Sequence, residues 1–393
     1  MARSGSPDLM RTFVSPMMPY FLADVYFGLE PAGKGNGTTS GCGLPVVDSK
    51  PLFTPNVYQK RCACFQLGHP NTSISYQTGC EISPEQLVEA ESAMLRLPPW
   101  SKLYVQVNLF ALFVRRLLPL LRGPTILLTG QFNFPSLTAL HEDERANFEA
   151  VLRSHRVVRW WTQSPVELPA GVSNAHKYRG LPYGVDHRQL SQYSECWAHA
   201  HPPKKTREVY YSPFSLRGRD ASDARARLAG LPQYASSTTK LSYTKYCSQL
   251  AAARFVISPA GDRFECFRHW EAIGLGTVPV CDCPRVYSQI VPGGMLIASN
   301  STELVELAQR PWLLRARYTE QQRQQRGCRR EIVTNAVRVG FWRRQVDADL
   351  PTTLQTAGAL ESCFGVRQGQ PETVTPVRGT DRLSVKQRLR PGW

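Results

Sequence analysis

The sequence lacks the features that would place it among membrane proteins or proteins with a recognisable secretory leader. Its longest apolar stretch, residues 109–128, is interrupted by Arg115, Arg116 and Pro119, whereas a bilayer span needs roughly 20 uninterrupted apolar residues. The opening MARSGSPDLMRTF has a basic residue but no apolar block after it, as a secretory signal would have. We therefore expect neither a transmembrane segment nor a signal in this chain, which leaves a cytoplasmic location open.

Several nucleotide and metal motifs are absent as well. The glycines do not follow the G-x-G-x-x-G pattern, and no G-K-[ST] follows the glycine turn near residue 261, which disfavours dinucleotide oxidoreductases and P-loop ATPases. Cys62 and Cys64 form a C-x-C pair without a second pair at zinc-ribbon spacing, so we predict no metal site there. No recognisable nucleic-acid-binding module is present.

The chain has the length and composition of a folded protein with two domains. Its 393 residues exceed one ordinary core, and 42% are hydrophobic, enough to offset the entropy of ordering most of the chain. The formal net charge of +16 and the pI of about 9.5 favour an acidic partner: a nucleotide, an anionic polysaccharide, a nucleic acid or a lipid surface. The alternative is that the positive charge contributes only to solubility.

An early stretch rich in Gly, Pro, Ser and Thr carries a group of cysteines, Cys42, Cys62, Cys64 and Cys80. Such crowding predicts disulfides that hold a loop-rich extension together, while the odd total of 11 leaves at least one thiol unpaired. Three triplets match the N-glycosylation pattern, at Asn36, Asn71 and Asn300. Cysteines and sequons together favour the secretory lumen.

From Ser83 onwards, apolar strands alternate with helices. The patterns predict strands near 102–110, 123–131 and 156–163 in the first half, and near 207–215, 254–259 and 277–280 in the second. Strands that are apolar throughout indicate a parallel sheet covered on both faces. The segment 191–207 is polar and contains Pro-Pro, which is typical of a linker; its His199 and His201 could chelate a metal, but a solvated linker is the stronger interpretation.

These patterns predict an α/β protein with two doubly wound, Rossmann-like domains facing a cleft. The predicted boundaries are an irregular cysteine-bearing extension at 1–82, an acceptor domain at 83–198, a nucleotide domain at 199–345 and a disordered tail at 346–393. The arginine-rich stretch 315–345 is predicted to be one long helix that packs back on the body.

The segment RFVISPAGDRFECFRHWEAIGLGTVPV, residues 254–280, has the chemistry of a nucleotide site. In a strand, glycine turn and helix unit, the first helical N–H groups point outward with the positive end of the helix dipole and can bind a diphosphate. Gly261 allows close approach, Ser258 offers a hydroxyl and Arg268 a charged contact, and Glu271 can accept hydrogen bonds from two ribose hydroxyls. The alternative is that Glu265, Arg268 and Glu271 form only intrahelical pairs.

This segment resembles the carboxyl-terminal nucleotide-sugar site of the exostosin-like glycosyltransferases. The shared pattern runs strand, S-P-x-G, an acidic residue, R-x-W-E-A and G-x-x-P-[IV]. The first half joins the resemblance through LLTGQFNFPSL, RVVRWWTQSP and YRGLPYGVDHRQL, so that it covers residues 100–300. Three positions depart from the pattern: Arg263 replaces a glycine, Glu265 an aspartate and Asn133 an aspartate.

The resemblance implies a GT-B fold and inverting transfer of a sugar from a nucleotide donor, UDP above all, to a hydroxyl of a glycan or glycoprotein. No cofactor and no divalent metal are implied, because fixed cations stabilise the departing diphosphate. The implied donor-binding residues are Ser258, Gly261, Glu265, Arg268, Glu271 and Arg225, with Arg227 as a further candidate. A general base is needed, and the candidates on the first domain are His141, Glu142, Asp143, His176 and Asp186.

Three other interpretations stay open at this point. Asp347 and Asp349 form a D-x-D triplet, which holds a metal in another glycosyltransferase architecture, but the half-charged FWRRQV before it makes a surface coincidence the better interpretation. The positive charge could serve nucleic-acid binding. A catalytically inactive sugar-binding relative is the third. We predict a glycosyltransferase that acts on a glycan or glycoprotein in the Golgi or secretory lumen, with no nucleic-acid partner and a membrane contact only through an anchor outside this chain.

Overall fold

The computed structural model describes residues 22–23, 25–27, 84–130, 136–186, 189–200, 204–212, 223–235, 241–260, 264–324 and 336–349. Several residues singled out in the sequence lie outside these ranges: the four early cysteines, the sequons at Asn36 and Asn71, and Asn133, His201, Gly261 and Arg263. The predicted disordered tail lies outside them beyond residue 349, but its first four residues, 346–349, are described and in part helical, so the predicted start of the tail is wrong. No described helix is long and apolar enough to cross a membrane.

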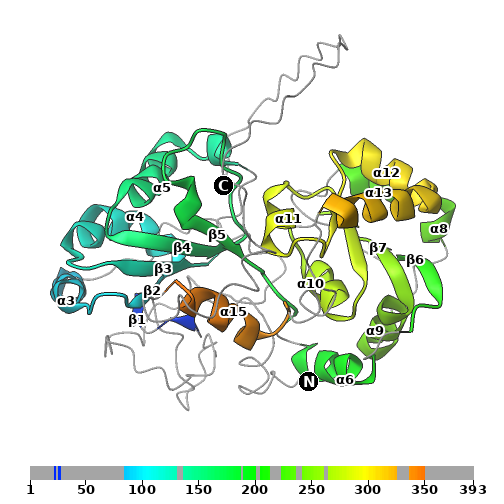
Figure 1. Ribbon diagram of the computed structural model, residues 1–393, viewed down its shortest axis with the longest axis horizontal. Coiled ribbons are helices and arrows are strands. Elements are labelled where there is room, and N and C mark those ends of the chain that lie inside the picture. Colours follow the sequence, from blue (N-terminus) through cyan, green and yellow to red (C-terminus); the bar gives the residue numbers. More distant parts are fainter. Residues whose placement is uncertain are drawn as a thin grey trace, which may run out of the picture.

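The first sheet has five parallel strands (Figure 1). In chain order they are β1 (Val25–Phe27), β2 (Lys102–Val105), β3 (Thr125–Thr129), β4 (Val157–Gln163) and β5 (Tyr178–Leu181). Each strand pairs with the next, so that Leu103 lies opposite Leu127 and Leu127 opposite Trp160. Because β1 pairs with β2, residues 25–27 are part of the first sheet, and the prediction that everything before residue 83 is irregular is wrong there.

The helices of the first half are α3 (Pro84–Arg96), the composite segment Val107–Leu120 and α5 (Glu142–Arg153), with short turns at Leu137–Ala139 and Ala175–Lys177. The apolar pattern NLFALFVRRLLPLL, residues 108–121, predicts this segment as one helix. It instead passes through a 3-10 turn, α4 (Phe110–Leu112), a π-helical turn (Phe113–Leu117) and a final 3-10 turn (Leu118–Leu120). Pro119 cannot donate the backbone hydrogen bond of a continuing α-helix, which accounts for the final turn.

The second sheet has four parallel strands, β6 (Arg207–Tyr211), β7 (Ala253–Ile257), β8 (Val278–Cys281) and β9 (Leu296–Ile297). The described helices of the second half of the chain are α6 (Leu190–His199), α7 (Asp223–Ala229), α8 (Pro232–Ala235), α9 (Tyr243–Ala252), α10 (Phe267–Gly274), α11 (Val286–Ile290), α12 (Ser301–Gln309), α13 (Pro311–Gln324) and α15 (Val339–Asp347). Two parallel sheets in a mixed α/β chain are compatible with Rossmann-like folding. Among the described strands, the spatial order of the strands in each sheet is the same as their order along the chain. The described strands therefore do not show the reversal of strand order that marks a ligand-binding crevice in doubly wound folds.

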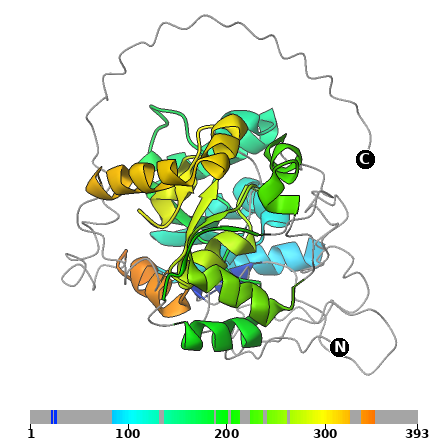
Figure 2. The same ribbon diagram turned by 90° about the vertical axis from the view of Figure 1, so that its right-hand side faces the viewer.

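The predicted linker at 191–207 is a helix over most of its length. Tyr193 of α6 is fully buried, and Figure 2 shows green α6 beside yellow-green α9. The helix forms because Leu190, Tyr193, Cys196 and Trp197 recur at helical spacing and meet the apolar core that also contains residues of α9 and α10. The polar residues between them hide this periodicity in the sequence. His199, predicted as a weak metal ligand, contacts the carbonyl of Glu195 at 2.6 Å.

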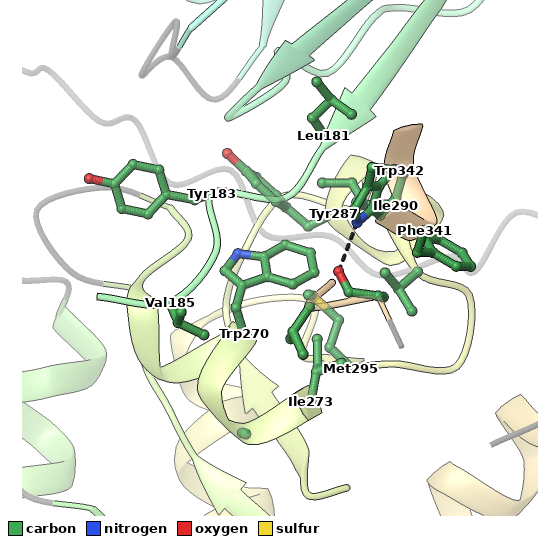
Figure 3. Packing of buried hydrophobic residues seen from close by; sticks show 14 of the residues in the cluster. Leu181, Tyr183, Val185, Trp270, Ile273, Tyr287, Ile290, Met295, Phe341 and Trp342 are labelled. Atoms are coloured by element: carbon green, nitrogen blue, oxygen red, sulfur yellow. Dashed lines mark hydrogen bonds between the residues drawn. The ribbon is translucent and has the colours of Figure 1, made fainter. Parts of the chain in front are cut away.

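Both sheets are covered on both faces, as the apolar strands predict. In β3 and β4, Leu127 and Trp160 face the core formed with α3, the composite segment and α5, while the next residues, Leu128 and Trp161, face the opposite core. That second core continues into the other sheet through Val256 of β7 and the helices α9 and α10. The two sheets therefore share one apolar core, part of which Figure 3 shows.

Helix α15, near the carboxyl-terminal end of the described chain, packs against the first sheet and contributes to the core that the two sheets share. The predicted single helix over 315–345 is instead α13, which packs on the second sheet, and α15, which lies against the first sheet (Figure 1). Phe341 and Trp342 are buried in the shared core, and Trp161 and Trp342 meet edge to face with ring centroids 6.3 Å apart. Helix α15 thus packs onto the first sheet.

The D-x-D triplet fastens this helix to the first sheet. Asp347 pairs with Lys102 at 2.8 Å, and Asp349 accepts from Arg159 Nε at 2.9 Å and from Trp161 Nε1 at 2.8 Å. The interpretation of the triplet as a surface coincidence is therefore wrong, because both carboxylates have structural partners. A charged acceptor whose oxygens are engaged by fixed donors is a poor metal ligand.

We expect Asp349→Asn to lower the free energy of unfolding by about 2 kcal/mol, because an amide nitrogen would face one of the two donors. Asp347 is more exposed, at 31% against 15% for Asp349, so Asp347→Asn should cost less than about 1 kcal/mol. Urea denaturation of both variants measures the difference. No loss from Asp349→Asn would show that the triplet does not hold α15, and equal losses would contradict the ranking by burial.

Candidate functional site

The turn after β7 lies at the carboxyl edge of the second sheet and is held from three sides. The carbonyl of Ser258 contacts His269 Nε2 at 2.9 Å, Asp282 accepts from the amide of Ala260 at 2.8 Å, and Arg225 Nε donates to the carbonyl of Ala260 at 2.7 Å. Ser258 is fully buried. The backbone leading into the predicted phosphate turn is thus fixed before any ligand arrives.

Helix α10 begins at this turn with Cys266 as its N-cap. The amide of Cys266 donates to His269 Nδ1 at 3.1 Å, and the amide of His269 bonds the carbonyl of Cys266 at 3.0 Å. The amides of Phe267 and Arg268, in the same first turn, cannot find partners within the helix. They carry the positive end of the helix dipole at the carboxyl edge of the sheet.

Arg268 is half-buried beside that helix start, with its Nη1 3.5 Å from the hydroxyl of Ser258. Burial opposes its charge, but the Cys266 thiol and the nearby Tyr246, Tyr234 and Glu271 side chains raise the pKa of the guanidinium. Arg268 is therefore a fixed cation, and the structure brings it together with Ser258 as the sequence predicted.

Glu271 lies one turn further along α10, where its carboxylate is buried. Its two oxygens accept hydrogen bonds from the hydroxyls of Tyr243 and Tyr246, each at 2.8 Å, and both tyrosines come from α9. The sequence left open that Glu271 forms only pairs within its own helix. The structure instead places its tyrosine hydrogen-bond partners on the neighbouring helix α9. Burial, with a contribution from the charge of Asp186, raises the pKa of Glu271 to about 7.

This raised pKa predicts a pH-dependent stability. Between the ordinary pKa of 4.5 and about 7, Glu271 binds a proton in the folded chain but not in the unfolded one, so the free energy of unfolding falls as pH rises through this window. The contribution of this carboxyl is about 3 kcal/mol across the window. Urea denaturation from pH 4.5 to 7.5 should show a flatter pH dependence for Glu271→Gln than for the natural protein; identical slopes would contradict the prediction.

Glu265 is placed differently from Arg268 and Glu271. It is buried at 1% exposure and accepts hydrogen bonds from the amide and hydroxyl of Ser164, from the amide of Tyr183 and from Trp270 Nε1. Ser164 and Tyr183 follow β4 and β5 of the first sheet. The structure thus brings Glu265 against the strand ends of the first sheet.

Arg225 and Arg227 also lie in different surroundings. Arg225 is buried and supports the turn through the carbonyl of Ala260, so it lies at the predicted site. Arg227 is exposed and donates to Thr302 on α12, at 2.9 Å. Nothing in the local sequence pattern distinguishes the two arginines, which lie only two residues apart on α7.

The three favoured candidates for a general base occupy different places. Asp186 follows β5, at the carboxyl edge, close enough to Glu271 for its charge to raise the pKa of that carboxyl. Asp143 is exposed in the first turn of α5, with His141 at the N-cap and Glu142 beside it. His176 is exposed and precedes β5, so it lies at the amino end of that strand, opposite the edge where Asp186 lies.

One group of side chains in the described residues has the composition of a metal site. His269, Cys281 and Cys283 are buried, with their potential ligand atoms within 4.8 Å of one another. Nδ1 of His269 accepts from the amide of Cys266, so its proton lies on Nε2, which faces the carbonyl of Ser258. This arrangement leaves the ring no lone pair for a metal. The five cysteines within the described ranges are free thiols.

Sequence reasoning missed the partners of these residues. Tyr243 and Tyr246, Asp282, Ser164 and Tyr183 all contact the site from elements far along the chain. The helical spacing of Tyr243 and Tyr246 was visible, but nothing local showed that Glu271 would face them.

Comparison with known families identifies part of the chain. Residues 219–307 match the family model described as RXYLT1 C-terminal domain, which spans α7 to α12 and includes the whole β7, turn, α10 and β8 unit. The match supports an exostosin-like or xylosyltransferase-type glycosyltransferase family and a glycosyltransferase-type function. No curated protein matches the chain.

Proposed function

We propose that this protein moves a sugar from a nucleotide donor to an acceptor hydroxyl. The proposal starts from the match of residues 219–307 to an exostosin-like or xylosyltransferase-type family. The donor we propose is a UDP-sugar, the acceptor a glycan or glycoprotein, and the outcome inversion. The observation that carries the proposal is the start of α10, where Arg268 and first-turn amides lie beside Ser258 within the matched segment.

The diphosphate of the donor would bind at this helix start. First-turn amides and the helix dipole favour two negative charges, and Arg268 adds a charged donor. As the bond to the sugar breaks, negative charge grows on the departing diphosphate, and donors already fixed in place stabilise it without reorganisation. We propose that these groups do the work of a divalent ion, so that transfer needs no metal.

Glu271 would hold the ribose. Each of its oxygens accepts one tyrosine hydroxyl and has a second lone pair, so the carboxylate can still accept from ribose hydroxyls. Tyr243 and Tyr246 fix its rotamer, which reduces the entropy lost on binding. Arg225 contributes by holding the turn, through the carbonyl of Ala260.

The acceptor would approach from the first domain, in a GT-B arrangement of the two sheets. Asp186 is the base we favour, because it lies at the carboxyl edge and next to Glu271, whereas His176 lies at the other end of β5. The net charge of +16 suits an anionic glycan acceptor. We place the reaction in the Golgi or secretory lumen, on the sequons and the family match; Asn300, the described sequon, is exposed.

The test is a panel of nucleotide sugars presented to the purified chain, with binding by calorimetry and product identification by mass spectrometry. We expect one donor to bind and to be hydrolysed or transferred at equal rates with and without EDTA. Loss of turnover with EDTA would exclude the metal-free mechanism. Binding without turnover would identify an inactive relative, and salt-sensitive RNA or DNA binding with no donor binding would support a nucleic-acid function.

A further inference from the structure

The contact between Glu265 and the first domain joins the two parts that a transfer reaction must align. Oε1 accepts from the amide of Ser164 at 3.0 Å and from its hydroxyl at 2.9 Å, while Oε2 accepts from the amide of Tyr183 at 3.1 Å. Trp270 Nε1 completes the set at 2.7 Å, from α10 itself. Three of the four donors come from the first domain, so the carboxylate ties two strand ends of one sheet to the helix start of the other.

The surroundings show that this contact is built and not incidental. Ser164 has a φ of 46°, in the left-handed region that a residue other than glycine occupies only when its surroundings hold it there. The ring of Tyr183 stacks on Phe267, the first residue of α10, with centroids 4.8 Å apart and planes at 22°. Figure 3 shows Tyr183 and Trp270 close to Tyr287 below the end of β5.

What this contact fixes is the chain segment that bears Asp186. Tyr183, Val185 and Asp186 follow one another after β5, and both Tyr183 and Val185 are buried. On the other side, Glu265 lies three residues before Arg268 on the same turn and helix start. A shift of this contact would therefore change the distance between the candidate base and the cation at the donor site.

We propose that Glu265 is a positioning residue for the transfer reaction: it sets the first domain's Asp186 segment against the donor-binding start of α10 without itself contacting the donor. The proposal rests on the function proposed above. It predicts that loss of the contact lowers turnover and leaves donor affinity almost unchanged, because the donor-binding groups stay on their own domain.

The variant Glu265→Gln tests this directly. Whichever way the amide points, its nitrogen faces at least one donor that cannot accept, so at least one of the four hydrogen bonds is lost. Glu303→Gln is the matched control, because Glu303 on α12 accepts from the backbone amide of Ser299 and from the guanidinium of Arg317 on α13, both within the second half of the chain. Should Glu265→Gln not fold, Ser164→Ala removes one bond of the same contact.

Two measurements are expected to separate the variants. Amide hydrogen exchange in the segments 160–168 and 181–186 should accelerate by about tenfold in Glu265→Gln and stay unchanged in the control. Turnover should fall roughly 10- to 100-fold, since small misplacements of reacting groups have effects of that size, while the KM for the donor stays within about threefold.

Unchanged exchange in both segments would overturn the proposal, and so would a loss confined to donor KM, which would make Glu265 a donor-binding residue instead. If the natural protein turns over no nucleotide sugar, the proposed function fails. The exchange rates then still decide whether Glu265 joins the two domains.

Discussion

Arg268→Ala should reduce sugar transfer by roughly 100- to 1000-fold in kcat, the range found when one fixed donor to a developing negative charge is removed. The guanidinium lies at the start of α10, with Nη1 3.5 Å from Ser258 Oγ, where the proposed diphosphate leaves. Its charge matters most in the transition state, because negative charge on the diphosphate grows as the sugar departs. Steady-state kinetics with the donor identified in the panel measures the effect.

Arg227→Ala is the matched control, because Arg227 is exposed on α7 and its Nη1 donates to Thr302 on α12. We expect its kcat to stay within about twofold of the natural protein. Arg268→Lys should recover only part of the loss, since an ammonium cannot reproduce the planar fork of donors. Full activity in Arg268→Ala would remove the cation from the mechanism and with it the reason for a metal-free reaction.

Gly274→Ala should destabilise the protein by about 3 kcal/mol or more, although alanine is normally the better helix former by about 1 kcal/mol. A Cβ at this position would lie 2.0 Å from the hydroxyl of Tyr193 and 2.7 Å from Cγ2 of Val337. Neither neighbour can withdraw easily: both are fully buried, and the Tyr193 hydroxyl donates to the carbonyl of Glu271 at 3.3 Å. Overpacking therefore outweighs helix propensity.

Thermal denaturation should show this as a fall of roughly 5 to 10 °C in melting temperature. Gly230→Ala provides the comparison: Gly230 is exposed after α7, and its nearest contact would be the carbonyl of Arg227 at 3.5 Å. That change should move the free energy of unfolding by less than about 0.5 kcal/mol. Equal stability of the two variants would mean that α6, α10 and the segment at Val337 are not packed together.

Local signals in the sequence predicted the elements that a short stretch of chain determines. The apolar strands at β3, β4, β7 and β8 and the helices between them are where periodicity places them, because each buries a face that its own residues define. The juxtaposition of Ser258 and Arg268 followed from the same logic, since ten residues of strand, turn and helix bring them together. The family match then covered the same unit.

Contacts between distant segments could not be predicted in this way. Glu265 has a charge and a position in a motif, which suggested donor binding, but its partners Ser164 and Tyr183 lie 101 and 82 residues earlier. Asp349 likewise looked like part of an exposed acidic triplet until the structure placed it beside Trp161, 188 residues away. The identity of a buried carboxylate's partners depends on how the domains pack.

Helix α15 shows the same limit in backbone terms. The arginine-rich pattern from residue 315 predicts helix throughout, and the described residues are helical at both ends. Nothing in the pattern shows that Phe341 and Trp342 leave the second domain and enter the core beside Trp161. Aromatic pairs of this kind add only about 1 kcal/mol each, yet together with Asp347 and Asp349 they decide which sheet the helix covers.

The most direct measurement of the central claim is a crystal structure of the chain with UDP. We predict the diphosphate at the start of α10, within hydrogen-bond distance of the first-turn amides and the Arg268 guanidinium, and the ribose against Glu271. A diphosphate bound elsewhere, with Arg268 still directed at Ser258 and Glu271 contacted only by Tyr243 and Tyr246, would contradict the assignment of this helix start as the donor site.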